Sequence, residues 1–196
     1  YDTVGTERTF STYDNQEITV SGGNYGWVID QEKETDALYQ DIMDKKTEVR
    51  EPVYEQEAQS RNTNDIGYSY IEIDLTRQRM VLYQNGSPIV DTGFAASSST
   101  PTGVYRLGDK QEAASVDFWM PFTDKLGIYG DSGLVITGTD LSDETGDSGD
   151  FGSSEESVDF GSSDSWMSTE GCIVLPEEQA QTIYQNVDSG LPVVIY

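Results

Sequence analysis

The sequence predicts a mainly β domain that closes with a C-terminal helix, preceded by a small α+β module. Residues 70–75 alternate apolar and polar side chains, which is typical of a half-buried strand. Residues 31–46 instead repeat apolar positions at helical spacing. The polar stretch 55–67 lies between these patterns and reads as a linker. We therefore place the small module at residues 1–66 and the main domain at residues 67–196.

The small module contains one predicted strand and one predicted helix. Glu17–Val20 alternates and is followed by Ser-Gly-Gly, which favours a short strand that ends in a turn. Asp30 is a good N-cap for a helix over residues 31–46. Two apolar pairs at i,i+4 spacing give that helix an apolar side: Leu38 with Ile42, and Tyr39 with Met43.

The main domain opens with a predicted hairpin. Arg79–Gln84 follows the strand at 70–75, and Asn85-Gly86 is a strong signal for a type I′ turn before a returning strand at 88–94. A further strand is expected at 103–107. Near the C-terminus, Pro176 suits the first turn of a helix, and a buried strand is expected over 191–196.

Residues 140–165 form an acidic Gly/Ser insertion that contains Asp-Phe-Gly-Ser-Ser twice, at 150–154 and 159–163. Such a composition buries too little apolar surface to order itself, so we expect a mobile loop. Calcium binding is a more specific alternative for this insertion, but the spacing of its acidic residues differs from the Asp-rich calcium-loop pattern.

The composition excludes several functions. The formal net charge is -25, which disfavours nucleic acid and anionic membrane surfaces as partners. There is no histidine and a single cysteine, Cys172, so no internal disulfide forms and zinc chemistry of the usual kind is not expected. We expect no metal, no cofactor and no membrane insertion in this segment. The chain begins at Tyr1 rather than Met, so we expect a piece of a longer protein.

Several motifs resemble the L,D-transpeptidase family in the right order. Residues 168–173, Ser-Thr-Glu-Gly-Cys-Ile, resemble its catalytic motif, Ser/Thr-His-Gly-Cys followed by Ile or Val. Residues 99–105, Ser-Thr-Pro-Thr-Gly-Val-Tyr, resemble its substrate loop, and residues 118–122, Phe-Trp-Met-Pro-Phe, resemble a Tyr-Trp-Met-Pro stretch of Gram-positive members. Residues 20–30 and the helix that follows are similar to the small α/β, peptidoglycan-binding-like module of enterococcal-type members.

This resemblance implies a sandwich of mixed sheets and a nucleophilic cysteine that attacks peptidoglycan stem peptides. By resemblance, Cys172 is the nucleophile and the backbone amides near Gly171 and Cys172 form the oxyanion hole. The residues expected to contact substrate are Thr100, Pro101, Trp119 and Met120. The resemblance also implies an extracellular or cell-wall location, with an anchor upstream of residue 1, and cell-wall enzymes as further partners.

The chain departs from the family pattern around the sulfur. The family's general-base histidine falls at Tyr129, and the histidine before Gly-Cys falls at Glu170, next to Thr169. A tyrosine with a reference pKa of ~10 is no base at neutral pH. A carboxylate near the sulfur opposes formation of the thiolate. The substitutions therefore predict slow acyl transfer.

Three functions stay open from the sequence. The chain is a degenerate transpeptidase that binds stem peptides or partner enzymes, an active enzyme that uses Glu170 or Asp131 as base, or a structural module of the cell surface. Each of the residues singled out also has a purely structural explanation. Cys172 fits an inert buried thiol, Tyr129 a packing residue, and Trp119 and Met120 core residues.

Overall fold

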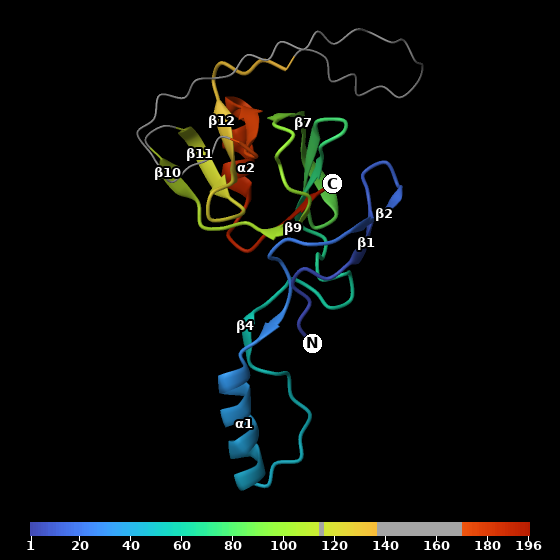
Figure 1. The fold of residues 1–196 in the computed structure, drawn as a ribbon, viewed down its shortest axis with the longest axis vertical. Coiled ribbons are helices and arrows are strands. Elements are labelled where there is room, and N and C mark those ends of the chain that lie inside the picture. Colours follow the sequence, from blue (N-terminus) through green and yellow to red (C-terminus); the bar gives the residue numbers. More distant parts are fainter. Residues whose placement is uncertain (114–115, 137–169) are drawn as a thin grey trace.

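The computed structural model describes residues 1–113, 116–136 and 170–196. Two five-stranded sheets dominate it (Figure 1). In spatial order, the first sheet contains β7 (Ser87–Gly93), β6 (Arg79–Gln84), β5 (Tyr70–Asp74), β14 (Pro192–Ile195) and β9 (Gly103–Arg106). The second contains β10 (Gln111–Ala113), β11 (Val116–Pro121), β12 (Gly127–Asp131), β13 (Ile173–Pro176) and β8 (Ala95–Ala96).

Both sheets are mixed, as expected. The pairs β12–β13 and β14–β5 are parallel, and the other pairs within the two sheets are antiparallel. Helix α2 (Glu177–Asn186) links β13 to β14 and so connects the two sheets. Its buried residues Ala180 and Ile183 join a core built from both sheets. Lys110 donates to the carbonyl oxygens of Tyr184 and Val187, at 2.7 and 2.8 Å. These carbonyl groups at the C-terminal end of the helix thereby gain a hydrogen-bond donor.

The predicted hairpin is confirmed. β5 and β6 have nearly the predicted bounds, and β7 returns after the turn. Asn85 and Gly86 both have positive φ, 51° and 80°, as a type I′ turn requires. The β-strand of residues 17–20 and the strand and helix near the C-terminus are confirmed as well.

The small module consists of two antiparallel strand pairs and one helix, and along the chain the helix lies between the two strands of the second pair. β1 (Arg8–Ser11) pairs with β2 (Glu17–Val20), and β3 (Val28–Ile29) pairs with β4 (Tyr54–Gln56). Asp30 caps α1 (Gln31–Met43) and accepts from the Lys33 amide at 3.0 Å. The helix ends before the predicted residue 46, because Lys45 takes a left-handed φ of 54°.

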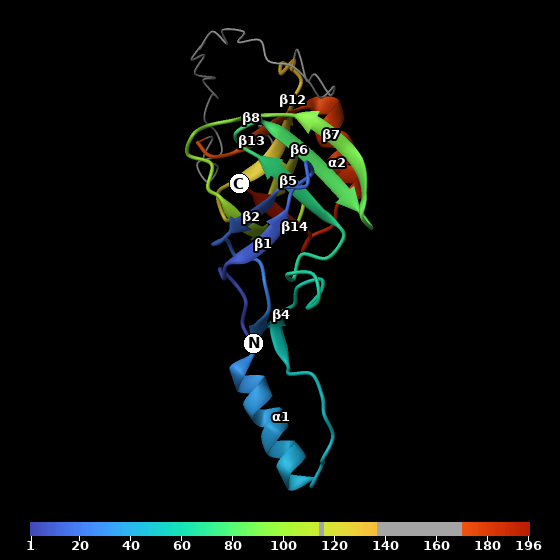
Figure 2. The ribbon, with the colours of Figure 1, turned by 90° about the vertical axis from the view of Figure 1, so that its right-hand side faces the viewer.

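Helix α1 points away from the two sheets, as Figures 1 and 2 show. It has no buried residue, and Leu38, Tyr39, Ile42 and Met43 are all at least half exposed. The i,i+4 pairs therefore lie along one side of the helix without joining the core of the described residues.

The interpretation of residues 55–67 as a linker was wrong. The segment begins within β4, and Ala58 and Ile66 are buried in the core of the small module. Asp65 forms an ion pair with Arg8 at 3.0 Å, with both side chains largely buried. This core also contains Val104 of β9 and Val194 of β14, so the small module packs directly on the first sheet. The boundary between residues 66 and 67 remains a prediction.

Two further expectations concern the insertion and membrane insertion. The insertion at 140–165 lies outside the described residues. Within the ranges that are described, no helix has both the length and the apolar character that a membrane span requires.

Candidate active site

Cys172 lies directly before β13, in a cluster with Trp119 of β11 and Tyr129 of β12. Each of the three residues is at most 2% exposed. The Trp119 and Tyr129 rings lie 6.3 Å apart. Val116, Leu126 and Val174 pack around the three residues. The Cys172 thiol and the Tyr129 ring therefore share one apolar environment.

Strand alternation explains why these side chains meet. Ile128 pairs with Ile173 in the parallel β12–β13 ladder, and both belong to the main core. Because side chains alternate along a strand, Tyr129 and Cys172 point to the opposite side. Side chains of β11 also point alternately to the cysteine cluster and to the main core.

An irregularity in β11 aims Trp119 at the cysteine. The ladder to β12 shifts register between Asp117 and Met120, and Phe118 has a φ of 58°. Trp119 joins the cysteine cluster, whereas Met120 joins the main core. A Cβ on Gly127 would lie 2.7 Å from the Trp119 ring, so the indole needs a glycine beneath it.

The cluster disfavours negative charge on either reactive atom. Burial raises the pKa of the Cys172 thiol, and a hydrogen bond with the Gly127 backbone only partly lowers it. Burial, together with the charges of Cys172 and Asp131, raises the pKa of Tyr129 to about 12. Both groups are therefore expected to be protonated at neutral pH.

The turn before Cys172 is fixed by a residue that the sequence reasoning missed. Gly171 has a left-handed φ of 91°, and its amide donates to Ser97 Oγ at 2.8 Å. Ser97 Oγ lies 2.7 Å from Ser99 Oγ, and the Ser97 carbonyl accepts from both the amide and the hydroxyl of Thr100. The neighbouring Ser-Thr-Pro motif was the sequence signal that could have pointed to Ser97. The oxyanion-hole role of Gly171 remains a prediction, and its amide already has an acceptor here.

The other predicted site residues are spread more widely. Thr100 is buried and Pro101 half-buried, in the loop that holds Gly171. Glu170 is exposed, and Thr169 lies outside the described residues. Asp131 Oδ1 accepts from the Gly133 amide at 2.7 Å, at the end of β12. No group of three or more His, Cys, Asp or Glu side chains suited to a metal occurs among the described residues.

Comparison with known proteins decides the family. The sequence profile of the L,D-transpeptidase catalytic domain, YkuD, matches residues 68–195. The chain belongs to the L,D-transpeptidase family. The match covers both five-stranded sheets and α2, and it includes Cys172, Tyr129 and the loop at 97–101.

Solved L,D-transpeptidase structures extend the likeness to the small module. A cysteine-to-serine mutant of the Enterococcus faecium L,D-transpeptidase is 25% identical, with a TM-score of 0.71 over 100% of this chain and 76% of that one. The avibactam carbamoyl enzyme of Ldtfm is also 25% identical, with a TM-score of 0.70 over 100% of this chain and 75% of that one. No curated protein sequence matches the chain.

Proposed function

We propose that this L,D-transpeptidase-family protein binds peptidoglycan stem peptides at Cys172 and transfers their acyl groups only slowly. L,D-transpeptidases act on such stem peptides. The observation that carries the proposal is the cluster itself, in which a buried thiol faces Tyr129 in a chain that has no histidine.

The reaction would need the thiol to lose its proton. Cys172 Sγ attacks the carbonyl carbon of the stem peptide, and a C–S bond forms while the C–N bond to the leaving D-alanine breaks. The thiol proton passes to the leaving amine. An acceptor amine then attacks the thioester carbonyl carbon, a new C–N bond forms while the C–S bond breaks, and the proton lost by the amine returns to the sulfur.

Burial opposes loss of the thiol proton, and this effect outweighs the hydrogen bond with the Gly127 backbone. Tyr129 holds its own proton more tightly than an ordinary tyrosine does, and burial raises the pKa of Cys172. Loss of general-base help is worth about 10²–10⁴-fold in rate. The fold of the family is kept, so we expect recognition of stem peptides to outlast efficient turnover.

The alternative of an active enzyme with a carboxylate base gains little support. Glu170 is exposed, and Asp131 Oδ1 already accepts from the Gly133 amide. A purely structural role would be revealed by the absence of stem-peptide binding. By family resemblance we place the protein outside the cell or in its wall, held by a segment upstream of residue 1, with cell-wall enzymes as further partners.

Restoring the imidazoles tests the proposal. The wild-type protein should cross-link a tetrapeptide donor very slowly, and Tyr129→His with Glu170→His should raise the rate about 10-fold or more, because general-base help is restored. Tyr129→Phe is the matched control, since it changes the same side chain without adding a base, and Cys172→Ser sets the background. The readout is cross-linked product by mass spectrometry. Fast wild-type turnover would refute the proposal and favour the carboxylate-base enzyme.

A further inference from the structure

Strand β1 of the small module has an edge without a partner strand, and a hollow lies beside it. The β1–β2 pair is a sheet of its own, so each of its two strands has one open edge. Thr9, Phe10 and Ser11 line a hollow of about 350 Å³ together with residues of the segment 63–68. An open strand edge can pair with a strand from another chain.

The register shows which backbone groups of β1 point away from β2. The Thr12 amide donates to the Gln16 carbonyl oxygen at 2.9 Å, so residue 12 faces β2. Because backbone groups alternate along an antiparallel strand, Thr9 and Ser11 face the open edge. The Thr9 carbonyl oxygen accepts there from the Asn64 side-chain amide. Among the described residues, the amides of Thr9 and Ser11 and the Ser11 carbonyl oxygen have no hydrogen-bond partner.

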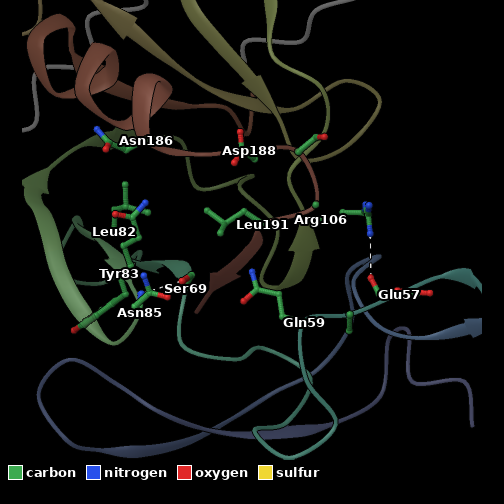
Figure 3. Close-up of a pocket in the computed structure, with 14 residues that line it drawn as sticks. Glu57, Gln59, Ser69, Leu82, Tyr83, Asn85, Arg106, Asn186, Asp188 and Leu191 are labelled. Carbon is green, nitrogen blue, oxygen red and sulfur yellow. Dashed lines mark hydrogen bonds between the residues drawn. The ribbon is translucent and has the colours of Figure 1, made fainter. Parts of the chain in front are cut away.

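The hollow beside this edge has an aromatic wall. Its described lining residues are all uncharged. Tyr70 and Tyr83 are stacked with their centroids 4.8 Å apart, and Tyr68 is 68% exposed. Figure 3 shows a neighbouring hollow of about 480 Å³, and the Tyr83 side chain points away from its centre. Since every second side chain of an added strand points the same way, an apolar side chain of that strand can lie on these rings.

The charge of the chain indicates what kind of strand fits. The net charge is -25, and two exposed carboxylates lie on the hairpin itself: Glu7 directly before β1, and Glu17 opposite Ser11 in β2. A second copy of this chain would be repelled by this charge. A segment with basic side chains would instead be attracted and steered to the edge.

We propose that the open edge of β1 and the hollow beside it form a docking site for an extended basic segment of another protein. The segment pairs with the backbone of Thr9 and Ser11 as a third strand of the β1–β2 sheet. One of its apolar side chains enters the hollow, and its basic side chains face solvent. The site requires no chemistry at Cys172, so it goes beyond the function proposed above.

The probe is an acetylated and amidated heptapeptide that alternates valine with lysine, titrated into the whole ¹⁵N-labelled chain by NMR. Saturable shifts are expected at the amides of residues 9, 11 and 68. Bound peptide should slow hydrogen exchange of the Thr9 and Ser11 amides at least about 5-fold, because each gains an acceptor. The Phe10 amide faces β2 and should change little.

Two proline variants separate the open edge of β1 from the rest of the hairpin. Ser11→Pro removes an amide that faces the open edge, and a proline is tolerated there because no described hydrogen bond is lost. It should weaken peptide binding at least about 5-fold. Thr19→Pro is the matched control: Thr19 pairs with Thr9, so its amide faces the far edge of β2, and binding should equal that of the wild type.

Tyr68→Ala tests the hollow without altering the backbone of β1, so it stays informative if a proline disturbs the hairpin. It should also weaken binding at least about 5-fold, as the loss of a ring contact does. Tyr39→Ala removes an exposed ring from α1 and should have no effect.

Several results would overturn the proposal. They are no saturable shift up to about 5 mM peptide, equal binding of a fully N-methylated peptide or of one with glutamate in place of lysine, and unchanged affinity in both Ser11→Pro and Tyr68→Ala. Dimerisation of the wild type in sedimentation that Ser11→Pro abolishes would also overturn it, because a second copy would then occupy the edge. Each of these results would leave the stem-peptide proposal standing, because that is measured by cross-linking at Cys172.

Discussion

Gly171 has a backbone conformation that few other residues tolerate. Its φ is 91°, and an added Cβ would lie 3.2 Å from the Ser99 carbonyl oxygen and 3.3 Å from the Leu126 side chain. The same residue donates its amide to Ser97 and so fixes the turn that precedes the thiol. Close packing and backbone strain act together at this one position.

Gly171→Ala should therefore lower the free energy of unfolding by about 1–3 kcal/mol, since a left-handed non-glycine residue is strained and the site is crowded. Gly86→Ala is the matched control, because Gly86 also has a positive φ of 80° but nothing lies within 4 Å of its added Cβ. It should lose only the strain contribution, about 1 kcal/mol. Urea unfolding of both variants measures the difference. An equal or smaller loss at Gly171 would mean that the turn is not packed as described.

At the scale of elements, the tip of the β1–β2 hairpin is held against β5 by buried carboxylates. Glu72 is fully buried, and its Oε1 accepts from the Tyr13 amide at 2.8 Å and from the Tyr196 hydroxyl at 2.7 Å. Asp74 binds Arg77 at 2.8 Å, and Arg77 also reaches Asp14 at 3.4 Å. Arg79 lies over the Tyr13 ring. The hairpin is thus attached by polar contacts as well as by its apolar core.

Burial raises the pKa of Glu72, and the nearby Asp14 and Asp74 act in the same direction, although its two hydrogen bonds oppose them. A carboxyl whose pKa is higher in the folded state favours folding below its unfolded pKa, and this contribution is lost as the pH rises through the folded value. Glu72→Gln keeps the acceptor oxygen without the charge. It should be more stable than the wild type at pH 7, and the difference should shrink towards pH 4.

Urea midpoints from pH 4 to pH 8 measure this. Glu17→Gln, at an exposed position of β2, should show no such trend. The contrary result would be that Glu72→Gln loses stability relative to the wild type as the pH rises from 4 to 7. It would mean that the carboxylate is needed in its charged form.

The same region shows how far the sequence could predict the elements. The strand at β5 followed from its alternation, but alternation indicated one solvated face. Glu72 and Asp74 are in fact buried beneath the small module. Residues 55–67 are polar enough to read as a linker, yet Ala58 and Ile66 anchor them and Arg8 pairs with Asp65. Such long-range contacts leave no local signal. The strands around Trp119 and Tyr129 were missed because a bulge and buried neighbours obscure the period of two.

Prediction of the site was limited in the same way. The motif placed Cys172 and Tyr129 together, and the structure does bring them into one cluster. The hydrogen bond from Gly171 to Ser97 joins residues that are 74 positions apart. No spacing rule within the sequence anticipates it.

On the scale of the whole molecule, self-repulsion dominates the electrostatics. The net charge of -25 destabilises the compact state, and salt screens this repulsion over about 10 Å at 0.1 M. The buried pair of Arg8 and Asp65 is shielded from such screening. Raising NaCl from about 20 to 500 mM should therefore raise Tm by about 2–4 °C. Circular dichroism during heating measures this. A lower Tm at high salt would show that attractive surface ion pairs outweigh the repulsion.

The central claim is the proposal that burial keeps the Cys172 thiol protonated at neutral pH and so slows acyl transfer. The most direct measurement is the rate of Cys172 alkylation by iodoacetamide across a pH series, on the native chain and on the chain unfolded in urea. The unfolded chain should titrate near ~8.5, the value of a free cysteine. The native chain should react slowly at pH 7 and show a midpoint above that of the unfolded chain, because burial raises the pKa of Cys172. A native midpoint at or below pH 7 would contradict the account, since it would require a base or a cation that stabilises the thiolate.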